Sequence, residues 1–190
     1  MKKILIVFFI ILFNKTFSQK KLFFTLQSGL NGVQGYTGIF FGANMEYKKF
    51  DLELAYFDAG RKVKKVNYNL ILNYWARDSW DDSKINLKYK FKLKDQNLYF
   101  TPYIGYSYVE FYKVTGFKSR GILGIYEQSE AKKSYFHGIA TGLTINILTN
   151  MRWGFLFGAD QTFYDRYNPV FRFYFGLSYD IIKRNLSNQK

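Results

Sequence analysis

The sequence predicts an all-β fold, namely an eight-stranded antiparallel up-and-down transmembrane β-barrel. Apolar and polar residues alternate with a period of two along most of the chain, as in KINLKYKFKL (84–93), which has one apolar face and one largely cationic face. Aromatic residues make up 22% of the chain, although the mean hydropathy is only -0.22. The connections between alternating segments are short and long in turn, which is typical of membrane-spanning barrels.

The first segment has the pattern of a secretory signal peptide, which we expect over residues 1–18 and expect to be cleaved on export. Its apolar run is too short to span a bilayer as a helix, which takes roughly 20 residues. The features that indicate it are a basic start, the apolar run and small residues before the cut: Lys2, Lys3, 4–13, Thr16 and Ser18.

The rest of the chain is expected to form one domain, a barrel over residues 19–182 followed by a short polar tail at 183–190. The absence of cysteine excludes disulfides and a lipid anchor on a cysteine. The net charge is +14, and loss of the signal peptide, with three lysines and no acid, leaves +11. In an exported protein this charge favours membrane lipid and anionic glycolipid as partners over nucleic acid.

The first four alternating segments place apolar side chains on one face and polar ones on the other. In FDLELAYF, Leu52 and Leu54 alternate with Asp51 and Glu53, and KINLKYKFKL follows the same rule. These four segments are 21–31, 37–47, 50–57 and 84–93.

The last four segments repeat the pattern with more glycine on the polar face. In SYFHGIATGLTINIL, Ile139 and Leu143 alternate with Gly138 and Gly142. Pro102 in the fifth segment lacks the N–H that a strand ladder uses, so we expect a bulge there. The segments are 98–112, 134–148, 151–163 and 169–181, lengths that suit tilted spanning strands.

The connections are predicted to be short at one rim and long at the other. Short turns are expected at Lys48-Lys49, at 94–97 and near Thr149-Asn150, and long loops at 32–36, 58–83, 113–133 and 164–168. Residues 66–75 alternate as well, so they form either a ninth strand or a hairpin that extends above the membrane. We prefer the hairpin, because an odd strand number would place the two ends of the barrel on opposite sides.

The polar, glycine-rich face is predicted to line the interior of the barrel. An eight-stranded barrel is only just wide enough to be filled by side chains. The other face carries at least fifteen Phe, Tyr and Trp residues, which do not fit inside and in water would form an oversized apolar patch. A closed sheet in lipid satisfies every backbone hydrogen bond. The alternative is a soluble barrel that holds a hydrophobic ligand.

The chain resembles the small eight-stranded outer-membrane barrels of the OmpA and OmpX kind. In its general sequence pattern it also resembles the PorT-type outer-membrane β-barrel proteins. The stretches that carry the resemblance are LELAYFDAGRK (52–62), TPYIGYSY (101–108) and FYFGLSYDI (173–181). The resemblance implies a location in the outer membrane of a Gram-negative bacterium.

Charged residues on the interior face are expected to form a network of ion pairs that fills the lumen, because buried charges must be paired. The alternative is a narrow porin-like channel for small solutes or ions, lined by the same charges. The residues are Glu46, Asp51, Glu53, Lys88, Lys90, Arg152, Asp160 and Arg172.

The long loops are expected to carry a partner surface, made of the basic run RKVKK (61–65) and the exposed aromatic residues that follow it. Its partner would be an anionic glycolipid or another envelope protein, and the alternative is a merely solubilising cluster. The residues are Arg61, Lys62, Lys64, Lys65, Tyr74, Trp75 and Trp80.

No catalytic residue, metal site or cofactor motif is identified. His137 is the only histidine and lacks a visibly paired nucleophile, so a lipid-modifying enzyme is a minor alternative. Asp78, Asp81 and Asp82 lack the spacing of an EF-hand, so a solvated acidic turn is expected instead of a calcium site. The sequence therefore predicts a non-enzymatic membrane scaffold whose long extracellular loops bind a surface ligand or an envelope partner.

Overall fold

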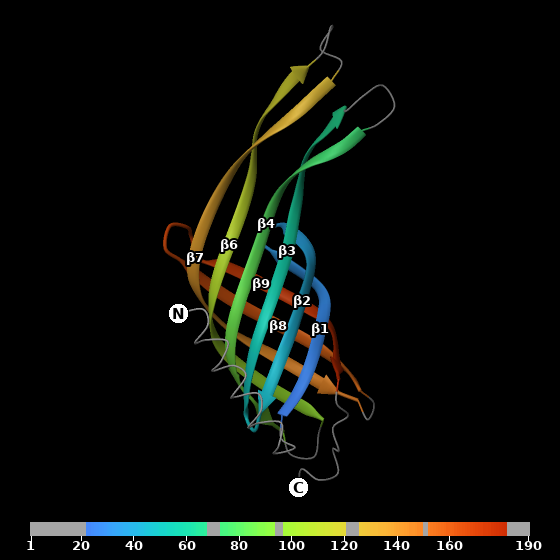
Figure 1. Ribbon diagram of the computed structural model, residues 1–190, viewed down its shortest axis with the longest axis vertical. Helices are drawn as coiled ribbons and strands as arrows, with labels where there is room; N and C mark the ends of the chain where they lie inside the picture. The colour runs from blue at the N-terminus through green and yellow to red at the C-terminus, as the bar shows by residue number, and fades with distance from the viewer. Residues whose placement is uncertain (1–21, 68–72, 94–96, 121–125, 150–151, 182–190) are drawn as a thin grey trace, which may run out of the picture.

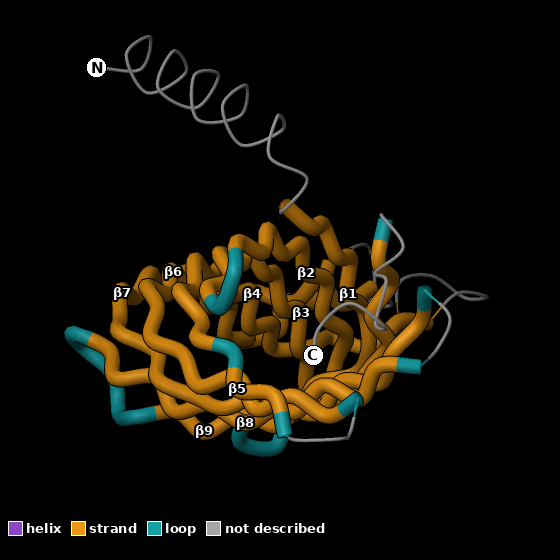
Figure 2. Tube along the Cα trace, turned by 90° about the horizontal axis from the view of Figure 1, so that it is seen from below, coloured by secondary structure: helices purple, strands orange, loops and turns teal. Residues whose placement is uncertain are grey.

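The computed structural model is a closed antiparallel barrel (Figures 1 and 2). It confirms the predicted eight-stranded fold. The residues that the structure describes include no helix long and apolar enough to cross a membrane. The expected signal peptide (1–18) and polar tail (183–190) lie outside the described residues, which are 22–67, 73–93, 97–120, 126–149 and 152–181.

Each strand pairs with the next along the chain, and β1 closes the ring against β9. The short β5 continues β4 in the same register along β6, so the two labels describe one barrel strand. The strands are β1 (Leu22–Val33), β2 (Tyr36–Tyr47), β3 (Phe50–Asn67), β4 (Asn73–Tyr89), β5 (Phe91–Lys92), β6 (Leu98–Arg120), β7 (Tyr126–Leu148), β8 (Trp153–Tyr164) and β9 (Val170–Asp180).

Tight turns join β1 to β2 and β2 to β3. Gln34 and Gly35 have φ angles of 44° and 83°, the left-handed pair that a two-residue hairpin favours. The loop predicted at 32–36 is therefore wrong, because the strands run up to this turn. The short turn at Lys48-Lys49 is present, with Lys48 at φ 57°. The predicted turns at 94–97 and Thr149-Asn150 lie partly outside the described residues.

Two hairpins rise beyond the closed barrel as separate arms (Figure 1). Pairing between β2 and β3 reaches only to Gly60, and pairing between β4 and β6 only to Ser79 and Tyr112. Above these points β3 pairs with β4 alone, and β6 with β7 alone. We call these hairpins the β3–β4 arm (61–67 and 73–78) and the β6–β7 arm (113–120 and 126–133).

The arms correct the predicted loops at 58–83 and 113–133, which are largely strand. The described part of 66–75 extends β3 and β4 and is not a ninth barrel strand. The alternation of lipid-facing residues predicts that these strands end at the membrane border, whereas the ladder of backbone pairs continues beyond it.

Pro102 lies in β6 without a bulge. It pairs with Leu143 of β7 in an unbroken register. On its other side the ladder stops at the pair of Lys88 with Tyr103 and resumes at the pair of Phe91 with Phe100, so the proline lies where pairing is interrupted and a missing N–H is tolerated. The predicted bulge at this proline is therefore wrong.

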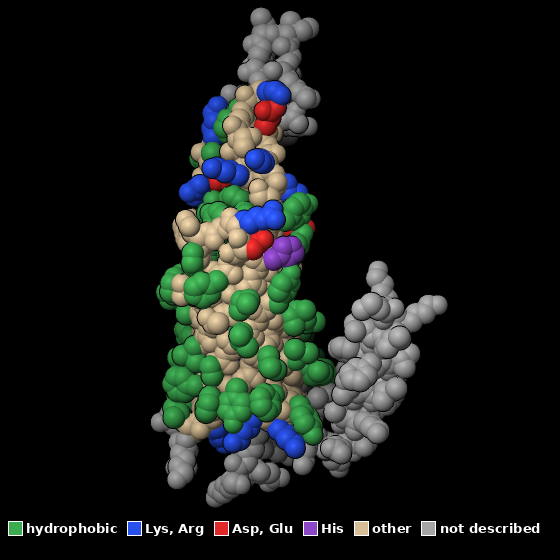
Figure 3. All heavy atoms as spheres, turned by 90° about the vertical axis from the view of Figure 1, so that its left-hand side faces the viewer, with side chains coloured by type: hydrophobic (Ala, Val, Ile, Leu, Met, Phe, Trp, Pro, Cys, Tyr) green, Lys and Arg blue, Asp and Glu red, His purple; other side chains and the backbone are tan. Residues whose placement is uncertain are grey.

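The outer wall carries a belt of apolar side chains between two charged borders (Figure 3). Phe173 is 65% exposed and is one of 29 large apolar side chains that are exposed on the described surface, most of them on this wall. The belt ends toward the arms at a row of three carboxylates that lie directly opposite one another on β3, β4 and β6: Asp58, Asp81 and Glu110. An outward apolar belt with charged borders is what a bilayer requires of a barrel.

Glycines inside the barrel make room for tyrosine rings. A Cβ atom at Gly142, Gly158 or Gly138 would overlap the tyrosine ring on the neighbouring strand. The three cross-strand pairs are Gly142 with Tyr103, Gly158 with Tyr174, and Gly138 with Tyr164. The interior is therefore filled by large side chains that the glycines accommodate.

Candidate functional site

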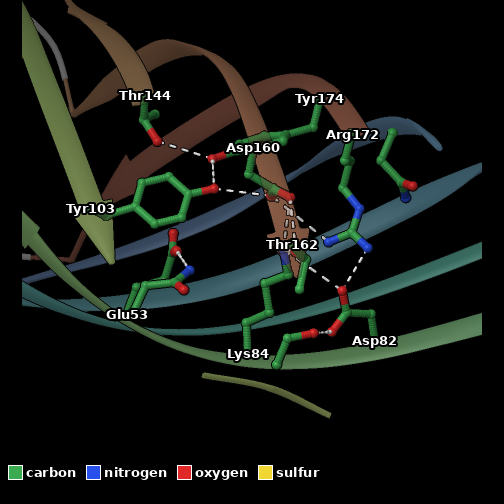
Figure 4. A network of polar contacts seen from close by, with 12 residues as sticks. Glu53, Asp82, Lys84, Tyr103, Thr144, Asp160, Thr162, Arg172 and Tyr174 are labelled. Carbon is green, nitrogen blue, oxygen red and sulfur yellow. Dashed lines mark hydrogen bonds and ion pairs between the residues drawn. The ribbon is translucent and has the colours of Figure 1, made fainter. Parts of the chain in front are cut away.

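Four charged side chains meet at the centre of the barrel (Figure 4). Asp82 and Lys84 come from β4, Asp160 from β8 and Arg172 from β9. The Arg172 guanidinium lies 2.5 Å from a carboxylate oxygen of Asp82, and the Lys84 ammonium lies 2.8 Å from Asp160. All four side chains are buried, so each charge is balanced within the protein and not by water.

A chain of hydroxyl groups links this centre to side chains of β6, β9 and β7 (Figure 4). Tyr103 donates a 3.0 Å hydrogen bond to Asp160, and its hydroxyl lies 3.2 Å from that of Tyr174. The Tyr174 hydroxyl lies 3.0 Å from that of Thr144 on β7. These bonds cross-link strands that are not neighbours and fill the middle of the lumen.

A second group of ion pairs fills the lumen toward the short turns. Lys88 lies 2.5 Å from Glu53, and Lys90 lies 2.5 Å from Glu46 and 3.6 Å from Asp51. The void beside them has a volume of about 20 Å³, room for about one water molecule.

Aromatic rings cover the charged centre on the side of the arms. The Trp80 ring is 5.3 Å from the rings of both Phe111 and Tyr167, and Phe136 is 5.0 Å from Tyr167. We call Trp80, Phe111, Phe136, Tyr164 and Tyr167 the aromatic cap. The aromatic cap and the ion pairs below it together fill the described part of the lumen with side chains.

Most of the predicted interior charges lie inside the barrel, but Arg152 does not. It is exposed at the end of β8, 3.3 Å from the hydroxyl of Tyr179. Residue 152 precedes the first residue of β8, so strand alternation no longer sets its direction. Those inside are Glu46, Asp51, Glu53, Lys88, Lys90, Asp160 and Arg172.

Asp82 and Lys84 are not among the predicted interior charges, although both belong to the central network. Asp82 was expected in a solvated acidic turn, which is wrong because the residue is fully buried. Lys84 is the first residue of KINLKYKFKL, and Asp82 lies two residues before it on the same face, so the period of two is the signal that identifies both. Among the described residues no group of three acidic or histidine side chains is placed to hold a metal ion.

Asp78 explains why the two arms separate. Its carboxylate accepts a 2.8 Å hydrogen bond from the backbone N–H of Val114 on β6 and lies 2.9 Å from Arg61 on β3. The side chain thus takes the N–H that would otherwise be available to extend the β4–β6 ladder. The ion pair with Asp78 raises the pKa of Arg61, so this guanidinium stays charged.

The predicted basic run lies on the β3–β4 arm, and its cations are exposed: Arg61, Lys62, Lys64 and Lys65. The Lys62 ammonium lies 5.2 Å from the centre of the exposed Trp75 ring. The prediction that Trp80 is exposed is wrong, because it turns inward into the aromatic cap and is 2% exposed. The Tyr74 side chain lies outside the described part of the structure.

His137 lies on the outer wall near the base of the β6–β7 arm. Its Nδ1 atom is hydrogen-bonded to the Tyr106 hydroxyl, and its ring centre is 5.2 Å from that of Tyr108. Nearby, Lys133 and Glu110 form a 2.8 Å ion pair, which raises the pKa of the lysine and lowers that of the carboxyl. The described contacts of the histidine ring are aromatic and phenolic, with no serine hydroxyl among them.

A groove of about 820 Å³ opens between the arms, directly above the aromatic cap. Tyr36, Phe111, Phe136 and Tyr167 supply its aromatic lining, and Arg61, Lys113 and Lys132 its cations. We call this space the mouth groove. Its volume lies within the usual range for small-molecule sites.

The fold is that of solved outer-membrane barrels, although no family model and no curated protein matches the sequence. A major outer membrane protein from Thermus thermophilus superposes with a TM-score of 0.62 at 13% identity, over 84% of this chain and 99% of that one. The N-terminal β-barrel domain of Pseudomonas aeruginosa OprF gives 0.55 at 8% identity, over 84% and 97%.

Ail of Yersinia pestis, solved in complex with the heparin analogue sucrose octasulfate, gives a TM-score of 0.51 at 11% identity, over 84% of this chain and 97% of that one. The predicted resemblance to small eight-stranded outer-membrane barrels is thus confirmed for the fold.

Proposed function

We propose that this protein is a non-enzymatic outer-membrane scaffold whose two arms bind an anionic ligand at the cell surface, such as a glycolipid headgroup or an acidic envelope protein. The signal-peptide pattern supports export, and the lipid-facing belt supports residence in the outer membrane. Long connections of such barrels face the outside of the cell, so the arms would be extracellular.

The charge of the arms is the observation that carries the proposal. Residues 61–77 contain five cations and no acid. On the described arms the carboxylates of Asp78 and Glu130 already pair with Arg61 and Lys118. The arms therefore present an excess of positive charge that a negatively charged partner would neutralise.

A polyanion as partner is chemically consistent with one structural neighbour. Ail was solved with a heparin analogue bound, and its barrel has the same strand number and form as this one. A sulfated saccharide is therefore a suitable probe.

The packed lumen favours a scaffold over the narrow channel. Ion pairs and the aromatic cap occupy the described interior, and the void near the short turns is about 20 Å³. Eight strands leave little further space.

The test is binding of heparin to the full-length protein reconstituted in phospholipid nanodiscs, measured at two salt concentrations. We expect salt-sensitive binding, because cation–anion contacts are screened by salt. A variant with Arg61, Lys62, Lys64 and Lys65 all changed to alanine should bind heparin at least tenfold more weakly. That change corresponds to a loss of ~1.4 kcal/mol in binding free energy.

The matched control changes four cations, Lys48, Lys49, Lys92 and Arg152, to alanine. These cations are exposed near the opposite rim, so the control lowers the net charge without touching the arms. Equal loss in the control would mean that only overall charge attracts heparin, and the arms would lose their proposed role.

A further inference from the structure

The mouth groove contains two lysines that face each other without an acid. Lys113 of β6 and Lys132 of β7 are directly opposite in the register, and both line the groove. Like charges in directly opposed positions of a sheet repel each other. Neither lysine has an ion-pair partner among the described residues. Such a pair is stabilised when an anion lies between the two ammonium groups.

The next residue along β7 is also a lysine, but it faces outward and has an acidic partner. Lys133 points to the outer wall, where its ammonium lies 2.8 Å from Glu110 and 4.8 Å from the centre of the Tyr135 ring. The chain thus neutralises the outward lysine and leaves the inward one of the same dipeptide unpaired. The unpaired charge is directed into the groove and not toward lipid.

The floor of the groove is aromatic and supported from below. Tyr167 is 37% exposed, and its ring packs 5.3 Å from Trp80, 6.4 Å from Phe111 and 5.0 Å from Phe136. The Arg61 guanidinium closes one side, 4.9 Å from the centre of the Tyr36 ring. A ring-shaped ligand can lie flat on such a floor while its charged substituents reach the cations at the edge.

The geometry points to the mouth groove as a binding site for an anionic saccharide, a sugar that carries sulfate or phosphate groups. Its anionic groups lie between Lys113 and Lys132, and one sugar face lies on Tyr167. The combination of cations with an exposed ring selects this class over a simple ion, which would not use the aromatic floor. This assignment rests on the proposed anion-binding role of the arms and names the ligand class and the site within them.

The saccharide enters the groove from outside the cell and not from the surrounding membrane. The groove lies above the aromatic cap, on the inward face of the β6–β7 arm, whereas a glycolipid in the same membrane meets the outer wall. A soluble saccharide and a glycolipid headgroup share the same chemistry, so both sources of ligand have to be tested.

The experiment titrates sucrose octasulfate into the full-length protein in phospholipid nanodiscs. Trp80 reports on the groove because its ring contacts Tyr167, provided that Trp75 and Trp153 are first changed to phenylalanine. We expect saturable binding, at least tenfold weaker in K113A/K132A and within twofold of the parent in K133A. The double variant keeps its fold if it still shifts in mobility on boiling, as the parent should.

The aromatic floor is tested with a second probe, linear polyphosphate, which has charge but no sugar ring. We expect Y167A to weaken sucrose octasulfate at least fivefold and to leave polyphosphate unchanged, with Y167F restoring the saccharide. If Y167A weakens the binding of both probes equally, or of neither, the proposed saccharide site is wrong. Anion binding by the arms would still stand.

Nanodiscs that contain lipopolysaccharide separate the two sources of ligand. We expect sucrose octasulfate to bind them with the same affinity, because the groove is not filled from the membrane. If lipopolysaccharide competes with sucrose octasulfate in the parent, and this competition disappears in K113A/K132A, then the glycolipid occupies the groove. That result would overturn the inference that the ligand is a soluble saccharide. Failure of both heparin and sucrose octasulfate to bind the parent would instead refute the proposed function itself.

Discussion

Arg172 and Asp82 form an ion pair with a distance of 2.5 Å at the centre of the barrel, although they are 90 residues apart in the chain. The guanidinium also lies 4.2 Å from the centre of the Phe57 ring. Both side chains are buried, so the pair joins β4 to β9 across the lumen, where no backbone hydrogen bond connects them.

Removal of one partner of this pair should destabilise the barrel strongly. We expect R172A to lower the free energy of unfolding by about 3–5 kcal/mol, because Lys84 is then the one cation near the buried carboxylates of both Asp82 and Asp160, which leaves one negative charge uncompensated. The measurement is urea-induced unfolding in lipid vesicles, followed by tryptophan fluorescence.

The exposed Arg152 offers the matched control. R152A should change stability by no more than about 0.5 kcal/mol, as surface substitutions do. The double variant R172A/D82A should recover part of the loss. Equal effects of R172A and R152A would show that the central pair contributes nothing to stability.

A larger residue at an interior glycine should disturb the barrel. The same substitution at the next residue along the strand, which faces lipid, should not. G158L places its side chain against the Tyr174 ring, and we expect a loss of about 1–3 kcal/mol from overpacking. A159L faces the lipid side, where a leucine is compatible, and serves as the control. The temperature at which the folded band is lost on a denaturing gel ranks both variants against the parent.

The packed lumen predicts that the protein does not conduct ions steadily. In planar bilayers we expect no open level for the parent, and none for W80A, because the ion pairs below the aromatic cap remain in place. A porin reconstituted in parallel verifies the assay. A steady current that changes when Lys88, Lys90 or Arg172 is neutralised would support the channel instead.

The absence of cysteine makes the orientation of the arms directly measurable. On intact cells a membrane-impermeant maleimide should label K65C and K118C, which lie on the two arms, and should not label K48C at the tight turn between β2 and β3. After permeabilisation all three should react. Labelling of K48C alone on intact cells would place the arms on the periplasmic side.

Much of the fold follows from local alternation. In FDLELAYF, Leu52 and Leu54 face lipid while Asp51 and Glu53 are buried, as the period of two requires. A strand that lies between lipid and a packed interior shows this pattern in its own residues, so neighbouring strands are not needed to recognise it. The face that points outward was predictable because the aromatic side chains exceed the volume inside eight strands.

The ends of the strands were less predictable. The hydrophobic pattern fades where β3 and β4 leave the lipid, yet the ladder continues to Asn67 and from Asn73. Both faces of a two-stranded arm outside the lipid carry charged and polar residues, so the alternation of apolar and polar positions that marks a membrane strand is missing. Arg61 and Asp78 were therefore assigned to a loop.

The sequence by itself determined the strand pattern, the outward face and the basic character of the region that became the β3–β4 arm, because each depends on residues close together in the chain. Only the tertiary structure decided that Asp82 pairs with Arg172, that Trp80 is buried, and that Lys113 and Lys132 share a groove with Tyr167. Those contacts depend on closure of the barrel and on the shear of its strands, which bring distant residues to the same height in the lumen.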